Sequence, residues 1–155
     1  MEGVSVRRAE VRDLAKVVAV ERASDGLTHW NEGVWSTVLG ADATVRAAFV
    51  AEVEDEVVGF AVVARVAEVA EIESIAVAKK ARRRGVAKAL CVDCMAWARD
   101  VGATQMELEV RESNVGARSL YRSMGFVEQG RRRGYYQAPV EDAVLMGVVL
   151  GDGGD

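Results

Sequence analysis

Ile72-Glu73-Ser74-Ile75-Ala76-Val77, followed by Arg82-Arg83-Arg84-Gly85-Val86-Ala87-Lys88, is the stretch of sequence that decides the fold. The first segment is apolar and typical of a strand, and the second opens an amphipathic helix pattern that runs to Val101. The first N–H groups of a helix attract anions, and a glycine lets the backbone approach them closely. Neighbouring arginines add donors suited to phosphate. The stretch is therefore an anion site between a strand and a helix, or only a solvated basic turn.

The spacing within this stretch is not that of the common nucleotide-binding loops. The chain has no Gly-x-x-x-x-Gly-Lys-Ser/Thr segment and no Gly-x-Gly-x-x-Gly segment after a strand. What it has instead is Arg82-x-x-Gly85-x-Ala87. This pattern resembles the pyrophosphate-binding signature of the GNAT acetyltransferases, Gln/Arg-x-x-Gly-x-Gly/Ala.

Further motifs extend the resemblance from about Ile75 to Met146, and they are similar to those of one GNAT branch, the ribosomal-protein alanine N-acetyltransferases. These motifs are Leu108-Glu109-Val110-Arg111, Ser113-Asn114, Leu120-Tyr121, Met124-Gly125-Phe126, Arg132-x-Gly134-Tyr135-Tyr136 and Glu141-Asp142-Ala143. Upstream, Thr28-His29-Trp30-Asn31 resembles the family's His-x-x-Pro-Trp-Ser segment, although its proline is missing.

The resemblance implies a cosubstrate, acetyl-CoA, and the residues that bind it. In the family, the strand before the turn binds the pantetheine arm and polarises the thioester carbonyl through backbone N–H groups. Asn114 would hydrogen-bond the cofactor, or it serves only as a helix N-cap. Carried over to this chain, the implied cofactor-binding residues are Ile75, Ala76, Val77, Arg83, Arg84, Gly85, Val86, Ala87, Lys88 and Asn114.

Two further residues are candidates for proton transfer. Glu109 lies on the polar face of an alternating strand, and the resemblance places a general base there. The alternative is a solvated strand carboxylate, a description that fits Glu107 better. Tyr121, in the helix after Asn114, is the candidate acid for the leaving thiolate, and the alternative is a packed helix tyrosine. A serine triad around the single His29 is not expected, so the amine should attack acetyl-CoA directly.

The acceptor groove is expected to include Tyr135 and Trp30. Residues 131–136 lie between the last two predicted strands. They form either a wall of that groove, with tyrosines shaping a slot for an extended peptide end, or a solvated basic turn.

Length and composition set the frame. A chain of 155 residues suits one domain, expected over 1–150 with a frayed tail at 151–155. The formal charge of −4 gives no reason to expect nucleic-acid binding. No apolar run approaches the roughly 20 residues that span a bilayer, and no secretory signal is visible, so a cytoplasmic protein is expected.

Cys91 and Cys94 fall on an apolar helix stripe and are predicted to be buried thiols rather than metal ligands, so no metal is expected.

The periodicity predicts a mixed α/β sheet, and the resemblance implies the GNAT fold, a single, mostly antiparallel sheet flanked by helices. The predicted strands are 4–7, 47–53, 57–66, 68–77, 105–110, 126–130 and 143–150, and the predicted helices are 12–24, 31–40, 86–101 and 114–124.

The expected function is acetylation of the N-terminal α-amine of a protein, most plausibly a small-subunit ribosomal protein beginning with alanine. Two alternatives stay open. One is an acetyltransferase for a small amine or an antibiotic, and the other is a non-catalytic acyl-CoA-binding domain. An intact Glu109 and Tyr121 argue against the second alternative.

Overall fold

The computed structural model describes residues 3–24, 30, 32–137 and 139–151. The expectations for Thr28, His29, Asn31 and the tail residues 152–155 lie outside this part of the chain. Among the residues described, none of the helices has the length and apolar character that crossing a membrane requires.

Seven strands form one sheet in the order β1-β2-β3-β4-β5-β7-β6. All neighbouring pairs are antiparallel except β4 and β5, which are parallel, so the predicted mixed and mostly antiparallel sheet is confirmed. The strands are β1 Val4–Arg8, β2 Arg46–Val53, β3 Glu56–Val66, β4 Val69–Val77, β5 Gln105–Arg111, β6 Val127–Gln137 and β7 Val140–Val149.

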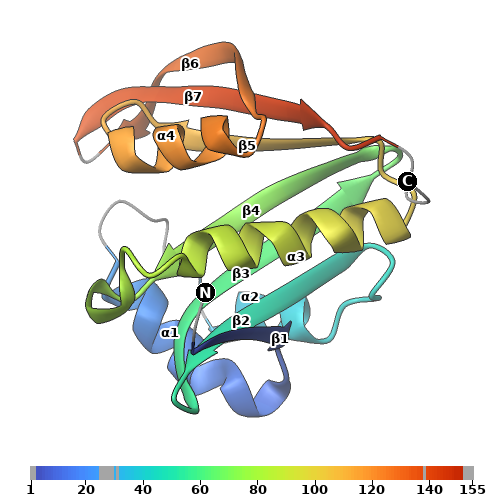
Figure 1. The fold of residues 1–155 in the computed structure, drawn as a ribbon, viewed down its shortest axis with the longest axis vertical. Coiled ribbons are helices and arrows are strands. Elements are labelled where there is room, and N and C mark those ends of the chain that lie inside the picture. Colours follow the sequence, from blue (N-terminus) through green and yellow to red (C-terminus); the bar gives the residue numbers. More distant parts are fainter. Residues whose placement is uncertain (1–2, 25–29, 31, 138, 152–155) are drawn as a thin grey trace.

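Helices cover both faces of the sheet. They are α1 Leu14–Arg22, α2 Glu32–Leu39, α3 Val86–Asp100 and α4 Val115–Ser123, with short 3-10 turns at Val11–Asp13 and Lys79–Ala81. Figure 1 shows α3 lying along the half of the sheet made by β1 to β4, and α4 beside the half made by β5, β7 and β6. The helix predicted from residue 12 begins instead with the 3-10 turn, where the Glu10 N–H donates to Asp13 Oδ2 at 2.7 Å and the Asp13 N–H donates to the Glu10 carbonyl oxygen at 2.8 Å.

Two apolar cores hold these layers together. One lies beneath α3 and α4 and includes Leu90, Met106 and Phe126. The other lies beneath α1 and α2 and is centred on Trp35, whose ring meets the Phe60 ring edge-on at 5.1 Å. Because each face of the sheet has its own core, each side chain on β4 and β5 belongs to one side of the molecule or the other.

The last hairpin is longer than predicted. Residues 131–136, expected to form a turn or groove wall between strands, lie inside β6, and the two strands extend to Gln137 and Val140. A bulge interrupts their pairing between Arg132 and Tyr136. Gly134 lies within the bulge at φ +60° and donates its N–H to Asp142 Oδ1 at 3.0 Å. The expectation of a turn was wrong because an edge strand with mostly exposed side chains lacks the alternating hydrophobic pattern of a strand.

Candidate active site

A gap between two neighbouring strands defines the site. β4 and β5 pair only from Val69↔Gln105 to Ile72↔Leu108, and beyond that point each strand pairs only with its other neighbour. A cavity of about 890 Å³ occupies this opening. It is bordered by the second half of β4, the start of α3, the end of β5 and α4. The volume falls within the range of small-molecule binding sites, roughly 300–1,000 Å³.

The backbone of β4 presents hydrogen-bond donors to this cavity. The Ala78 N–H donates to Val58 O of β3 at 2.7 Å. Because N–H directions alternate along a strand, the Ile75 and Val77 N–H groups point away from β3, toward the side where β5 has separated. Of the three predicted backbone donors, Ile75 and Val77 therefore face the opening, whereas the Ala76 N–H faces β3. All three residues line the cavity.

The turn between β4 and α3 joins a strand to a helix that begins after Gly85, as the sequence predicts. Gly85 is the N-cap of α3 at φ +77°, and Arg83 also adopts a left-handed conformation at φ +66°. No side chain caps the helix from Gly85, and left-handed residues in a turn create a concave array of N–H groups. Arg82 braces the turn by donating its Nε–H to Val77 O at 3.2 Å.

The residues of this turn that were predicted to bind the cofactor differ in whether they line the cavity. Arg83, Gly85, Val86, Ala87 and Lys88 line the cavity, whereas Arg84 is exposed and is not among the lining residues. The Val86 side chain is only 1% exposed and packs in the core, so this residue has only its backbone to offer a ligand.

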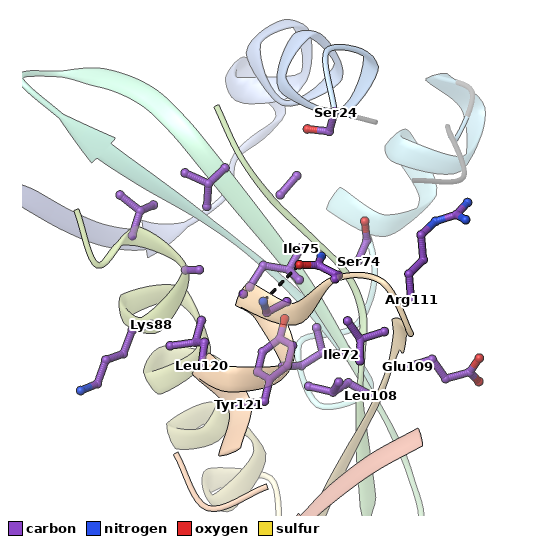
Figure 2. Close-up of a pocket in the computed structure, with 18 of the residues that line it drawn as sticks. Ser24, Ile72, Ser74, Ile75, Lys88, Leu108, Glu109, Arg111, Leu120 and Tyr121 are labelled. Carbon is purple, nitrogen blue, oxygen red and sulfur yellow. Dashed lines mark hydrogen bonds between the residues drawn. The ribbon is translucent and has the colours of Figure 1, made fainter. Parts of the chain in front are cut away.

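Glu109 and Tyr121 lie on opposite faces of the sheet. On β5, Leu108 and Val110 point into the core beneath α3 and α4, so Glu109 between them points to the face of α1 and α2. Tyr121, on α4, belongs to the core that holds Leu108. Figure 2 shows the Tyr121 hydroxyl directed toward Ile75, and the Glu109 carboxylate pointing away from Tyr121. The open gap between β4 and β5 is thus bordered by a carboxylate on one face and a phenol on the other.

The surroundings of Glu109 are acidic. Arg132 Nε lies 3.5 Å from Glu109 Oε1, while Glu109 Oε2 is buried without a hydrogen-bond partner in the described part of the chain. Desolvation, followed by the charges of Glu73, Glu109 and Glu107, raises the pKa of Glu71. A face carrying this many carboxylates favours a positively charged group such as a protonated amine.

Tyr121 is almost enclosed. Its side chain packs against Phe126 with ring centroids 5.7 Å apart, and the residue is 4% exposed. Burial raises the pKa of its phenol above the usual range. Nearby, Asn114 Oδ1 accepts the Ala117 N–H at 3.1 Å, so Asn114 does act as the N-cap of α4, and its amide nitrogen remains available for a cofactor contact.

The predicted acceptor-side residues border the same cavity. The backbone N–H of Trp30 donates to Glu21 Oε2 at 3.1 Å. The buried Trp35 donates its indole N–H to Glu21 Oε1 at 3.2 Å. The fully buried Glu21 carboxylate thereby holds Trp30 in place. Tyr135 is half exposed at the rim, and Tyr136 beside it is covered by the Arg111 guanidinium, 4.1 Å from the ring centroid.

Sequence reasoning missed several residues of this site. Ser74 and Glu71 line the cavity from β4, and Arg132 approaches Glu109 from β6. Strand alternation offers a signal for Ser74, but the bulge in β4 at Glu73 changes which face it occupies. Nothing in the sequence indicates that Arg132 meets Glu109, because that contact depends on the order β5-β7-β6.

The two cysteines behave as predicted. Cys91 and Cys94 are fully buried in the core beneath α3, and burial raises the pKa of the Cys91 thiol to about 12. Such thiols stay protonated and are poor nucleophiles.

A family model, curated relatives and a solved structure that are similar to this chain are all acetyltransferases. The acetyltransferase (GNAT) family model matches residues 16–126. An N-alpha-acetyltransferase of Sulfurisphaera tokodaii is 32% identical over 94% of this chain and 92% of its own length. The ribosomal protein bS18-alanine N-acetyltransferase of Salmonella typhimurium is 35% identical over 63% of this chain and 67% of its own length. The crystal structure of the ribosomal-protein-S18-alanine N-acetyltransferase from Escherichia coli matches with a TM-score of 0.84, at 28% identity, over 95% of this chain and 94% of that one.

Proposed function

The chain belongs to the acetyltransferase (GNAT) family, and on that premise we propose that it acetylates the N-terminal α-amine of a protein, that of a small-subunit ribosomal protein beginning with alanine. It is an acetyl-CoA-dependent N-acetyltransferase, as its family and relatives are. The observation that carries the proposal is the gap between β4 and β5, with Glu109 on one face and Tyr121 on the other. This arrangement suits two reactants that enter from opposite sides and meet in the gap.

The cosubstrate would enter from the side of α3 and α4. The N–H groups at the start of α3 would hold its pyrophosphate, assisted by Arg83 and Lys88. The Ile75 and Val77 N–H groups would hydrogen-bond the pantetheine arm and the thioester oxygen. Fixed donors directed at the oxygen where negative charge develops contribute on the order of 3 kcal/mol each to catalysis.

The acceptor amine would enter from the face of α1 and α2, where Glu109 lies. A free α-amine has a pKa near 8, so roughly a tenth is neutral at pH 7. Glu109 would take one proton from the α-ammonium, directly or through one water, and the neutral nitrogen would then bond to the acetyl carbon. The carbon–sulfur bond breaks, the nitrogen loses its second proton to solvent, and the thiolate leaves on the side of Tyr121.

Tyr121 would stabilise that thiolate by hydrogen-bond donation. A thiolate with a conjugate-acid pKa near 8.5 is a weak base toward a phenol whose pKa burial has raised further. The phenol therefore retains its proton until late in the step and acts mainly as a donor.

A protein acceptor is supported by the rim of the cavity and by the relatives. Trp30, Tyr135 and Tyr136 place aromatic walls where an extended peptide would leave the site. The Salmonella and Escherichia relatives are named as N-acetyltransferases for an alanine of ribosomal protein S18. A small amine remains the second candidate, because the carboxylates around Glu109 would attract any cation.

The experiment is an acceptor screen read by release of CoA. The purified protein is given acetyl-CoA and one of four acceptors: an Ala-initiated peptide, the same peptide with a blocked N-terminus, spermidine, or an aminoglycoside. We expect turnover on the free peptide only. Faster turnover on spermidine or the aminoglycoside would identify a small-molecule acetyltransferase, and binding of acetyl-CoA without turnover on any acceptor would favour a non-catalytic domain.

A further inference from the structure

Ser74 places a hydroxyl on the cavity wall for which the described part of the chain provides no hydrogen-bond partner. The residue is 9% exposed, lines the cavity, and makes no hydrogen bond through its side chain with any residue that the structure describes. The Ser74 oxygen is not one of the fully buried side-chain atoms without a partner, so it is open to whatever occupies the cavity. A ligand bound there can therefore form a hydrogen bond with it.

A bulge in β4 determines where this hydroxyl lies. Val62 and Val63 of β3 face Ser74 and Ile72, so Glu73 is an extra residue on β4. Without the bulge, Ile72, Ser74 and Ala76 would share one face. With it, Ile72 packs in the core beneath α3, whereas Ala76 packs in the core beneath α1 and α2. Ser74 thus lies on the face of Ala76, and Figure 2 shows it on the side of the cavity that faces Ser24, just after α1.

Glu109 occupies the same face on the other side of the opening. The paired segment ends at Ile72↔Leu108, so Glu109 is the first residue of β5 past the separation, and Ser74 follows two residues beyond Ile72 on β4. The carboxylate and the hydroxyl therefore border the mouth of the gap from its two sides. A group that approaches the gap from the face of α1 and α2 passes between them.

We infer that the Ser74 hydroxyl accepts a hydrogen bond from the α-amine of the acceptor and holds its nitrogen over the gap, across from Glu109. The inference rests on the proposed function. An α-ammonium has three N–H bonds. Loss of one proton to Glu109 leaves two N–H bonds and a lone pair. A bond to Ser74 fixes one of the remaining N–H groups, and this turns the lone pair toward the acetyl carbon.

The rival explanation is that Ser74 is only a small residue that fits beside the bulge. The explanations predict different effects of Ser74→Ala. If the hydroxyl serves the acceptor, its removal breaks no hydrogen bond within the described part of the chain, so the melting temperature stays equal while acceptor binding weakens. If Ser74 is only a small residue, alanine fits equally well and neither KM changes. If its hydroxyl serves the fold, the melting temperature falls and both substrates are affected alike.

The test compares wild type, Ser74→Ala and Ser5→Ala, a matched change of an exposed serine on β1 away from the cavity. KM values for an Ala-initiated peptide and for acetyl-CoA, and the melting temperature, are measured for each. We expect Ser74→Ala to raise the peptide KM about tenfold, to leave the acetyl-CoA KM unchanged, and to melt no lower than wild type. Ser5→Ala should match wild type in all three.

Three results are decisive against one claim or the other. A wild-type peptide KM in Ser74→Ala overturns the role of Ser74 but leaves the proposed function intact. A lower melting temperature with equal rises in both KM values also overturns it, in favour of a structural role. A wild-type enzyme that turns over spermidine but no peptide overturns the proposed function itself, and with it the α-amine as the partner of Ser74.

Discussion

At the scale of single residues, one substitution of Tyr121 can distinguish the packing of its ring from hydrogen-bond donation by its hydroxyl. Tyr121→Phe keeps the ring against Phe126 and removes only the hydroxyl. We expect the KM for acetyl-CoA to stay within about twofold and turnover to fall at least tenfold, a loss of about 1.4 kcal/mol in transition-state stabilisation. Steady-state kinetics on an Ala-initiated peptide measures both. Unchanged turnover would show that this tyrosine only fills the core.

Glu109 should show its role through pH. Glu109→Gln keeps the shape of the side chain but cannot accept the amine proton. Below pH 8 most of the acceptor amine is charged, so the loss of turnover should be greatest there. As the pH rises through about 8, the neutral amine accumulates and the variant should recover part of the wild-type rate. The pH–rate profiles of both proteins on one peptide test this, and a uniform loss across pH would exclude the role of base.

The ion pair between Arg132 and Glu109 could not be predicted from the sequence. The motif resemblance identified Glu109 as a site residue, and the structure brings it to the cavity. Its ion-pair partner comes from β6, which reaches it only because β7 inserts between β5 and β6. The face of the sheet on which Ser74 lies could not be predicted either, because the hydrophobic pattern of β4 does not indicate the bulge that changes it. Local chemistry is readable from local sequence, whereas contacts between distant strands depend on topology.

At the scale of elements, the turn from β4 into α3 was predicted well because its signal is local. An apolar strand, a basic run and a glycine at a helix start determine the geometry within 15 residues or so. The β6–β7 hairpin was predicted poorly for the opposite reason. Its strands are long, polar and bulged, and what keeps residues 131–136 in a strand is pairing with β7 rather than any pattern of their own.

The same turn allows a controlled substitution. Gly85 and Gly102 flank the two ends of α3, and both have left-handed backbones, at φ +77° and +93°. Gly85→Ala and Gly102→Ala should therefore lower stability by a similar amount, about 1 kcal/mol each. Of these two glycines, Gly85 lines the cavity and Gly102 does not. We expect Gly85→Ala to weaken CoA binding at least tenfold in calorimetry while Gly102→Ala binds like wild type. Equal affinities for the two variants would contradict the pyrophosphate assignment.

At the scale of the whole molecule, the sheet is two antiparallel halves joined by one short parallel contact. Four residue pairs link β4 to β5, from Val69↔Gln105 to Ile72↔Leu108. Past them the halves separate, each covered by its own helices. A ligand that fills the opening replaces the missing strand contacts and couples the halves. Because binding to the native state alone adds stability, CoA at 100 times its Kd should stabilise the protein by about 2.7 kcal/mol.

Binding in the opening should change the hydrogen exchange of individual backbone amides of β4. The Ile75 and Val77 N–H groups face the opening and should exchange with deuterium quickly in the free protein. The Ala78 N–H, bonded to Val58 O at 2.7 Å, should be protected throughout. On addition of acetyl-CoA, which carries the thioester oxygen, we expect protection of Ile75 and Val77 to rise at least tenfold and that of Ala78 to change only with global stability. Residue-resolved exchange by NMR measures all three. If Ile75 and Val77 still exchange quickly with acetyl-CoA bound, the cosubstrate stabilises the fold without bonding to these amides of β4, and the source of carbonyl polarisation must lie elsewhere.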